Sequence, residues 1–466
     1  MFDLPTAPPA QYGVEPSAIT RAIDALEREE LDPHGLVLAR RGHVLLRCSW
    51  RPYRTDQPAL VYSVSKTVLA LAIGFLVAEG RVDVRQLVDA YVDLPNPAGL
   101  TVAHLLTMNT GHSRKQTLAL PHDGYALLAT PPDYQPGTHF AYNSPASLVL
   151  SQIVTAATGE RLTAYLRPRL FDQLGIGERW WTPYGPIDQG YSGLHVSADD
   201  LLRLSVMLAD GGRFCGRQVV ARSWVDEMAK VWSDNSHHDP GSPEYSCGYG
   251  YQVWRSRHGF RADGSFGQFA IAVPEKGLAI AYEGASERQQ GVLDVLMELV
   301  ESVGEGPVAA DVAATTALAS RLENLDAWPS AGADSPVDQA QESSPGLAGE
   351  RWLLGRDQNG WTIDSGRFSI PVGDDVWVTS KRETVAHSGL FWLFSARGSV
   401  AVGGTVRVEV LVLTAPHRIT ATGTLGKPLT LTWHPTPLWN RGLDDLAVPV
   451  EVIMSGPEAE NSKSGV

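Results

Sequence analysis

The chain has 466 residues, of which 43% are apolar and 19% are charged. This composition is typical of globular proteins and excludes a fibrous repeat or global disorder. The formal net charge of −14 repels phosphate backbones and anionic headgroups, so we expect no nucleic-acid or membrane partner. The three cysteines, Cys48, Cys215 and Cys247, are too few and too far apart for a disulfide framework or a zinc knuckle.

The amino-terminal sequence, MFDLPTAPPAQYGVEPS, has neither the basic nor the apolar region of a secretory signal. The longest apolar stretch, residues 68–78, is about half as long as a bilayer span requires. We therefore expect a cytoplasmic protein, a compartment in which unpaired thiols are the usual state.

Hydrophobic periodicity predicts helices at residues 16–30 and 289–303 and a mostly helical region at 62–212. Alternating patterns predict strands at residues 35–50 (two strands and a turn), 248–254, 266–273 and 278–282. Strands near both ends with helices between them favour an α+β fold, an antiparallel sheet flanked by terminal helices with an inserted helical region. We assign this domain to residues 1–305.

The composition changes after about residue 304. Residues 309–325 are rich in alanine and helix-prone, residues 328–349 read as a linker, and we assign 306–350 to this helix and linker. Short alternating runs separated by Gly, Asp and Pro then predict a small all-β sandwich or barrel at 351–455, followed by a polar tail at 456–466.

One nucleophile pattern stands out, Ser63-Val64-Ser65-Lys66 at the start of an apolar helix. Positions i and i+3 share a helix face, so the Ser63 hydroxyl and the Lys66 amine can lie within hydrogen-bond reach. A desolvated lysine has a lowered pKa, and its neutral amine can accept the serine proton. Chance alone supplies roughly half an S-x-x-K match in such a chain, so the pattern carries weight only with its context.

That context resembles the serine β-lactamase and penicillin-binding superfamily. Residues 100–112 (LTVAHLLTMNTGH) resemble its T-x-x-H-L-L-T segment, and Tyr142-Asn143-Ser144 resembles its tyrosine motif. Residues 193–201 (GLHVSADDL) resemble a later stretch, and Ala262-Asp263-Gly264-Ser265 stands at the place of the K-T-G or H-x-G motif. The trailing Gly267-Gln268 resembles the esterase and 6-aminohexanoate-dimer-hydrolase-like branch.

The resemblance implies a role for each matched residue. Ser63 would be the acylated nucleophile, Lys66 its base, and Tyr142, with a lowered phenol pKa, would pass a proton to the leaving group. The oxyanion hole would consist of the backbone N–H groups of Ser63 and Ser265, and Gly264 would allow the close backbone approach that such a hole requires.

Departures from the family pattern bear on the substrate. Ala262 and Asp263 stand where a lactamase or transpeptidase offers a cation, so we expect neutral esters to be preferred over carboxylate-bearing β-lactams. Arg257, His258 and Arg261 are candidates to compensate for the missing cation, but we favour the interpretation that they are solvated loop charges. Ser144 and Trp181 are further candidates for substrate contact.

His104 is expected to brace its helix. Residues 237–239 (His-His-Asp) lack a third ligand at metal spacing, so we predict no metal and no cofactor.

The leading hypothesis is a cytoplasmic carboxylesterase or small-amide hydrolase that forms an acyl-enzyme on Ser63 and takes a small-molecule substrate. The alternatives are a β-lactamase or D-amino-acid peptidase/amidase, and a catalytically silent acyl- or peptide-binding module of the same fold. A homo-oligomer is compatible with the sequence.

Overall fold

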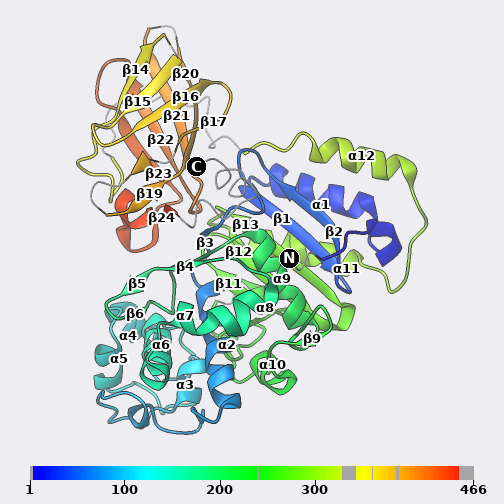
Figure 1. Cartoon of the computed structure of the whole chain (residues 1–466), viewed down its shortest axis with the longest axis vertical. Helices are drawn as coiled ribbons and strands as arrows, with labels where there is room; N and C mark the ends of the chain where they lie inside the picture. Colours follow the sequence, from blue (N-terminus) through cyan, green and yellow to red (C-terminus); the bar gives the residue numbers. More distant parts are fainter. Residues whose placement is uncertain are drawn as a thin grey trace, which may run out of the picture.

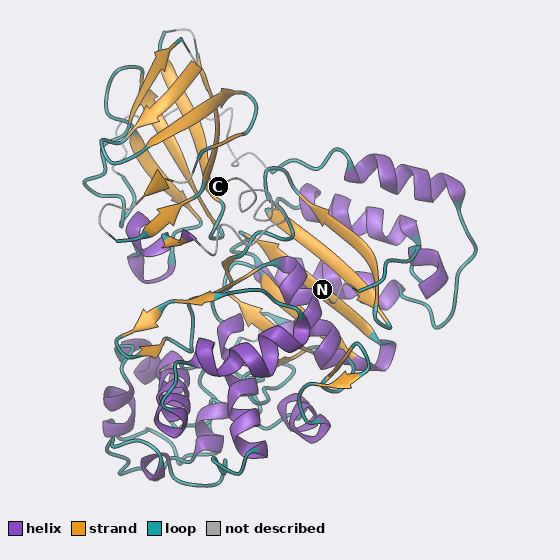
Figure 2. Cartoon of the chain, viewed as in Figure 1, coloured by secondary structure: helices purple, strands orange, loops and turns teal. Residues whose placement is uncertain are grey.

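The computed structural model describes residues 4–239, 241–327, 343–358, 360–381, 383–384, 388–401 and 403–450. Most of the linker predicted at 328–349 and the whole tail predicted at 456–466 lie outside these residues. Mixed helices and strands form two adjoining parts, a larger one around a central sheet and a smaller one rich in strands (Figures 1 and 2).

The central sheet is antiparallel throughout, with strand order β10-β11-β12-β13-β1-β2. Its strands are β1 (Pro33–Arg40), β2 (His43–Ser49), β10 (Trp254–Arg255), β11 (Phe260–Gly264), β12 (Gln268–Val273) and β13 (Leu278–Gly284). The predicted turn between β1 and β2 is present, with Arg41 and Gly42 both at positive φ. The last strand of this sheet along the chain, β13, therefore pairs with the first, β1.

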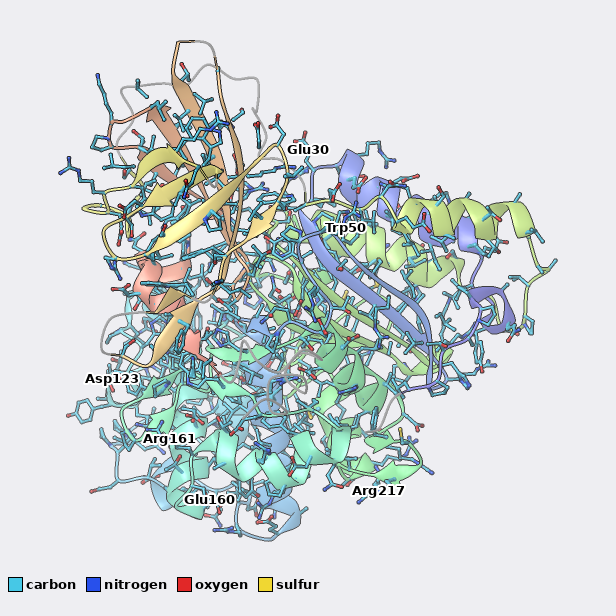
Figure 3. All side chains as sticks on the ribbon, turned by 45° about the horizontal axis from the view of Figure 1, so that its top comes forward. Glu30, Trp50, Asp123, Glu160, Arg161 and Arg217 are labelled. Atoms are coloured by element: carbon cyan, nitrogen blue, oxygen red, sulfur yellow. The ribbon has the colours of Figure 1, made fainter. Side chains whose placement is uncertain are left out.

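Helices cover both faces of this sheet. On one face α1 (Pro16–Arg28) and α11 (Gln289–Ser302) bury their leucine, isoleucine and valine side chains, and α12 (Val312–Leu322) packs on α1. Trp50, labelled in Figure 3, donates its indole N–H to Glu27 of α1 at 2.8 Å. These elements confirm the helices expected near residues 16–30 and 289–303.

On the other face lie α9 (Ala198–Ala209) and α2 (Val64–Ala78). Nearly every residue of α2 is buried, which agrees with its being apolar on all sides. α2 contacts α6 (Ser144–Thr158) and α7 (Leu162–Leu166), and α6 in turn contacts α3 (Val102–Leu106) and α5 (Gly124–Ala129). α10 (Arg222–Ala229) packs on α2 through Trp224, and the short helices α4 (Arg114–Ala119) and α8 (Asp172–Leu174) belong to the same helical region. His104 braces α3 as expected, because its ring accepts a hydrogen bond from the Thr101 N–H.

Short strand pairs link these helices: β3 (Ala59–Leu60) and β4 (Trp180–Trp181) flank β7 (Leu194–Val196), β5 (Pro183–Tyr184) pairs with β6 (Ile187–Asp188), and β8 (Arg213–Phe214) with β9 (Arg217–Gln218). The prediction of a strand at residues 248–254 is wrong, since β10 begins only at Trp254. Gly248 and Gln252 have positive φ, and a side chain at position 250 would collide with the Met228 carbonyl, so this segment is an irregular loop.

The smaller part, residues 343–450, is called the β region here. Its main sheet has the order β14-β15-β16-β20-β21-β22-β23, with β17 paired to β20. The strands are β14 (Leu353–Asp357), β15 (Gly360–Asp364), β16 (Ser369–Asp374), β17 (Val378–Thr379), β20 (Phe394–Val400), β21 (Thr405–Val412), β22 (His417–Thr424) and β23 (Thr430–His434). A small sheet adds β18 (Glu383–Thr384), β19 (Leu390–Trp392) and β24 (Val448–Pro449).

The β region packs directly on the segment that precedes α2. Leu60, Tyr62 and Phe266 belong to the same buried cluster as the core of the β region. The Leu60 N–H donates to the Thr414 carbonyl at 2.9 Å. A buried ion pair, Asp32 with Arg418 at 3.2 Å, joins the two parts a second time.

Among the described residues, we find no helix with the length and apolar character needed to cross a membrane.

The Asp32–Arg418 pair yields a stability prediction. Arg418→Met should lower the free energy of unfolding by about 3 kcal/mol, because it leaves the buried Asp32 carboxyl without its cation. The double variant Asp32→Asn/Arg418→Met should recover part of this loss. Urea unfolding followed by fluorescence measures the free energy of unfolding of Arg418→Met, Asp32→Asn and the double variant. A double variant that loses as much as the two single variants together would show that the two groups are not coupled.

Candidate active site

Ser63 lies at the amino-terminal end of α2, directly after the short strand β3. The Val61 N–H donates to the Leu194 carbonyl, so β3 and β7 together fix the backbone that leads into Ser63. Ser63 occupies the N-cap position, yet its hydroxyl makes no capping hydrogen bond. The oxygen is therefore left for other partners.

Lys66 is that partner. Its side chain is buried, with Nζ 3.0 Å from Ser63 Oγ and 2.8 Å from the Tyr191 carbonyl, to which it donates. Burial lowers the pKa of Lys66 to about 7, and the negative charge of Asp263 opposes this effect. Near neutral pH a large share of the amine is therefore uncharged, and a neutral amine that donates to Tyr191 has a lone pair for the Ser63 proton.

Tyr142 completes the group of side chains around Ser63. Its ring lies 4.8 Å from Lys66 Nζ and stacks on Trp254, and its hydroxyl is hydrogen bonded with Ser63. Burial raises the pKa of the Tyr142 phenol, and the hydrogen bond with Ser63 offsets only part of this rise. The expectation of a lowered phenol pKa is wrong, since burial outweighs the hydrogen bond with Ser63 and the negative charge of Asp263 adds to the rise. It stays a neutral hydroxyl that donates and accepts protons.

The backbone N–H groups predicted for the oxyanion hole come from two neighbouring segments. A Cβ placed on Gly264 would lie 2.2 Å from the Val61 carbonyl, so β11 approaches the chain before Ser63 as closely as only glycine permits. Ser265 follows in the turn after β11. Within the described residues, the structure gives no hydrogen bond for the backbone N–H of Ser63 or of Ser265.

A histidine of the β region holds both of these segments. Tyr62 donates its hydroxyl to His417 Nε2 at 2.6 Å, while His417 Nδ1 donates to the Pro435 carbonyl at 2.9 Å. Burial lowers the pKa of His417 to about 3, so the ring is neutral and Nε2 is an acceptor. Phe266 packs edge-on against both the Tyr62 ring and the His417 ring.

Tyr62 and Phe266 both have positive φ, at 46° and 68°. Left-handed backbone is unfavourable for such bulky residues and persists only where the surroundings hold it. One of them precedes Ser63 and the other follows Ser265. The contacts with His417 therefore fix the peptides from which the two N–H groups project.

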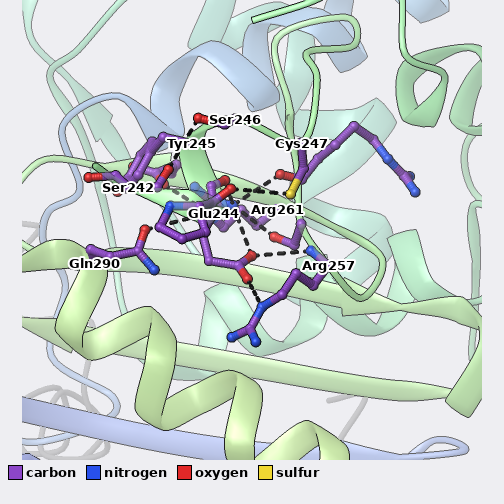
Figure 4. A network of polar contacts seen from close by, with 12 residues as sticks. Ser242, Glu244, Tyr245, Ser246, Cys247, Arg257, Arg261 and Gln290 are labelled. Atoms are coloured by element: carbon purple, nitrogen blue, oxygen red, sulfur yellow. Dashed lines mark hydrogen bonds and ion pairs between the residues drawn. The ribbon is translucent and has the colours of Figure 1, made fainter. Parts of the chain in front are cut away.

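Asp263 and Arg261 differ from their predicted roles. Arg261 is fully buried on β11, donates to Asp263 at 2.8 Å and contacts Glu244 (Figure 4), so its interpretation as a solvated loop charge is wrong. Arg257 is half exposed and pairs with Glu244, and His258 lies near Glu301. Because Arg261 compensates Asp263, the anion expected to repel carboxylate substrates is largely neutralised.

A pocket of about 520 Å³ opens beside Ser63. Among the predicted site residues, Ser63, Tyr142, Asp263 and Ser265 line it. Sequence reasoning missed most of its wall: His238, Asp239, Ser242, Tyr245, Trp254, Glu287, Arg288, Gln289, Gln290 and Gly291. The wall comes from loops, from the start of β10 and from the first turn of α11, and none of these has motif spacing, so the sequence carries no signal for it.

The remaining predicted residues lie outside this pocket. Ala262 is buried in the hydrophobic core, and Ser144 begins α6 after the N-cap Asn143. The interpretation of Trp181 as a substrate contact is wrong, because its side chain is 2% exposed in the core and donates its indole N–H to the Ser192 carbonyl. Trp181 thus supports the segment whose Tyr191 carbonyl holds Lys66.

Comparison with known proteins gives consistent results. A family model described as Beta-lactamase matches residues 23–291. The chain is 28% identical over 265 residues to a 6-aminohexanoate-dimer hydrolase of Paenarthrobacter ureafaciens, which covers 50% of this chain and 67% of the relative.

Two solved structures share the fold. A candidate 6-aminohexanoate-dimer hydrolase from Bacillus anthracis matches with a TM-score of 0.52 and 21% identity, over 65% of this chain and 87% of that one. EstCE1, described as a hydrolase with promiscuous acyltransferase activity, matches with a TM-score of 0.50 and 16% identity, over 62% of this chain and 98% of that one.

The pKa of Lys66 predicts how activity depends on pH. Below about pH 7 the amine is protonated and cannot accept the Ser63 proton, so kcat/KM should fall with decreasing pH and level off above pH 8. Lys66→Arg stays charged at every accessible pH and should lose activity by more than about 100-fold. Initial rates on p-nitrophenyl acetate between pH 5 and 9 test both, and a flat profile would argue against Lys66 as the base.

The hydrogen bond between Tyr62 and His417 predicts a second effect. Tyr62→Phe should lower kcat roughly tenfold with little change in KM, because the oxyanion hole acts on the transition state and not on substrate binding. Tyr165→Phe is the matched control, since it removes a hydroxyl that bonds Glu79 at the opposite end of α2. Equal losses in the two variants would show a general effect of a missing hydroxyl.

Proposed function

Because the chain belongs to the beta-lactamase family, we propose that it is a serine hydrolase that cleaves an ester or amide bond through an acyl-enzyme on Ser63. The observation that carries the proposal is the buried Lys66 amine 3.0 Å from Ser63 Oγ. A lysine with a pKa of about 7 has no evident structural use in an apolar core, whereas as a base beside a serine it is suited to catalysis.

The proposed reaction proceeds in two halves. Neutral Lys66 accepts the Ser63 proton as Oγ attacks the substrate carbonyl, and the N–H groups of Ser63 and Ser265 stabilise the resulting oxyanion. The proton then passes to the leaving group through Lys66 or the neutral Tyr142 hydroxyl, and the carbonyl–leaving group bond breaks. A water molecule then attacks the acyl carbonyl on Ser63 and gives a proton to the same groups. The bond between Oγ and the acyl carbon breaks, the proton returns to Oγ, and the acid is released.

Small esters and linear amides are the proposed substrate class. The matched relative is named as the hydrolase of a 6-aminohexanoate dimer, which favours a linear amide, and the pocket beside Ser63 is of a size for a small molecule. We keep the cytoplasm as the proposed location, because Cys48, Cys215 and Cys247 are all free thiols.

Ser63→Ala tests the proposal directly. It should abolish labelling by a fluorophosphonate probe and lower kcat on p-nitrophenyl esters by at least about 10³-fold, because the acyl-enzyme can no longer form. Ser17→Ala, on the helix across the sheet, is the control for handling and folding. Wild-type rates in Ser63→Ala would place the nucleophile elsewhere, and a wild-type protein that is neither labelled nor active would favour the silent binding module.

A further inference from the structure

A loop of the β region contacts the catalytic part at His122 and Tyr191. It contains Trp439 and Arg441, and Trp439 contacts the rings of His122 and Tyr191 edge-on at 4.8 and 5.9 Å. Tyr191 supplies the carbonyl that holds Lys66, and its ring lies 5.9 Å from Lys66 Nζ. Figure 3 shows Asp123, the neighbour of His122, at the base of the β region.

The loop has the marks of a functional element. Trp439 and Asn440 are consecutive residues with positive φ, at 63° and 52°, a conformation that costs free energy for side chains of this size. Trp439 is also 44% exposed, although it is one of the largest apolar side chains of the chain. Strain and exposure together present an indole next to Tyr191, whose carbonyl holds Lys66.

Arg441 lies on that indole, with its guanidinium 4.8 Å from the Trp439 ring centroid. Burial is the largest cause of the lowered pKa of His122 and of His195, and the positive charge of Arg441 lowers both pKa values further. The same charge opposes the burial that raises the pKa of Tyr62. Tyr62 directly precedes Ser63, and the charge of Lys66 also acts on His122. The Arg441 charge therefore acts on groups next to both members of the Ser63–Lys66 pair.

No ion pair recorded for the described residues involves Arg441. The acidic residues nearest in sequence are already engaged, because Asp444 pairs with Arg367 and Asp445 accepts from the Gly442 N–H. A cation that is stacked on an aromatic ring near the candidate site, with its carboxylate neighbours occupied, is suited to bind an anion from outside the protein.

We propose that Arg441, with Trp439 and His122, forms a subsite for a carboxylate group of the substrate. The class of substrate is then an ester or amide with an apolar segment that packs on the indole and a carboxylate that pairs with the guanidinium. The β region then supplies the cation that position 262 lacks, from the loop that contacts Tyr191. This inference rests on the proposed hydrolase function and specifies its substrate.

Two substrate pairs test it, one for each side of the scissile bond. The first pair is p-nitrophenyl valerate and mono-p-nitrophenyl glutarate, in which the glutarate has a carboxylate in place of the terminal methyl group of the acyl chain. The second pair is phenyl acetate and 3-acetoxybenzoate, in which the benzoate has an added carboxylate on the leaving group. Arg441→Gln should lower kcat/KM for the carboxylated member of at least one pair by about 10- to 100-fold, mainly through KM. For the neutral members the loss should stay below about threefold, and added salt should weaken the wild-type preference.

Arg356→Gln is the matched control, because Arg356 also stacks on a tryptophan, Trp361, at 5.1 Å, but on β14 of the β region. Rates in Ser63→Ala give the background, including self-hydrolysis of the glutarate. Equal losses on charged and neutral substrates in Arg441→Gln, or no loss in either pair, would overturn the inference.

A binding measurement separates this inference from the hydrolase proposal. Ser63→Ala, titrated calorimetrically, should bind glutaric acid monoanilide more tightly than valeranilide, and Arg441→Gln added to it should remove the difference. If the wild type neither labels nor turns over any ester, the hydrolase proposal fails, and this titration then decides whether the carboxylate subsite exists. Equal binding of the two anilides would refute it.

Discussion

The burial of one amine is the constraint on which the candidate site depends. Lys66 lies in an apolar helix with few polar partners, and taking an ammonium group out of water is costly unless it loses its proton. The fold reduces this cost with the Tyr191 carbonyl and the Ser63 hydroxyl, and both contacts also orient the amine for proton transfer. The same desolvation that would destabilise a charged lysine thus produces a base near neutral pH.

Most of the larger part serves to hold that arrangement. Trp181 fixes the segment of Tyr191, β7 fixes the backbone before Ser63, and the glycine at 264 brings β11 against it. The β region holds the segments at Tyr62 and Phe266 through its His417. The site is therefore assembled from segments more than 350 residues apart in the chain, with a single neutral imidazole joining two of them.

The sequence predicted what is local and periodic. The terminal helices and the first hairpin follow from hydrophobic spacing, and the structure has them within a few residues. The closeness of Ser63 and Lys66 follows from their i, i+3 spacing on a helix. It did not predict the loop at 248–254, where left-handed backbone overrides an alternating pattern.

The sequence also did not predict the ion pair between Arg261 and Asp263. Arg261 and Asp263 are two positions apart on one strand, and only the packing of Glu244 and Tyr245 around them shows that Arg261 is buried. The contacts of Tyr62 with His417 and of Trp439 with Tyr191 join distant segments that carry no motif, so they appear only once the chain is folded.

The bond between Tyr62 and His417 has a consequence for how such a chain can vary. A tyrosine at position 62 is tolerated only while an acceptor stands opposite its hydroxyl, since a buried unpaired hydroxyl is costly. Substitutions at 62 and 417 are thus expected to occur together in descendants of this protein. A shortened derivative that ends before the β region would need a phenylalanine at 62 and a new apolar cover over Phe266.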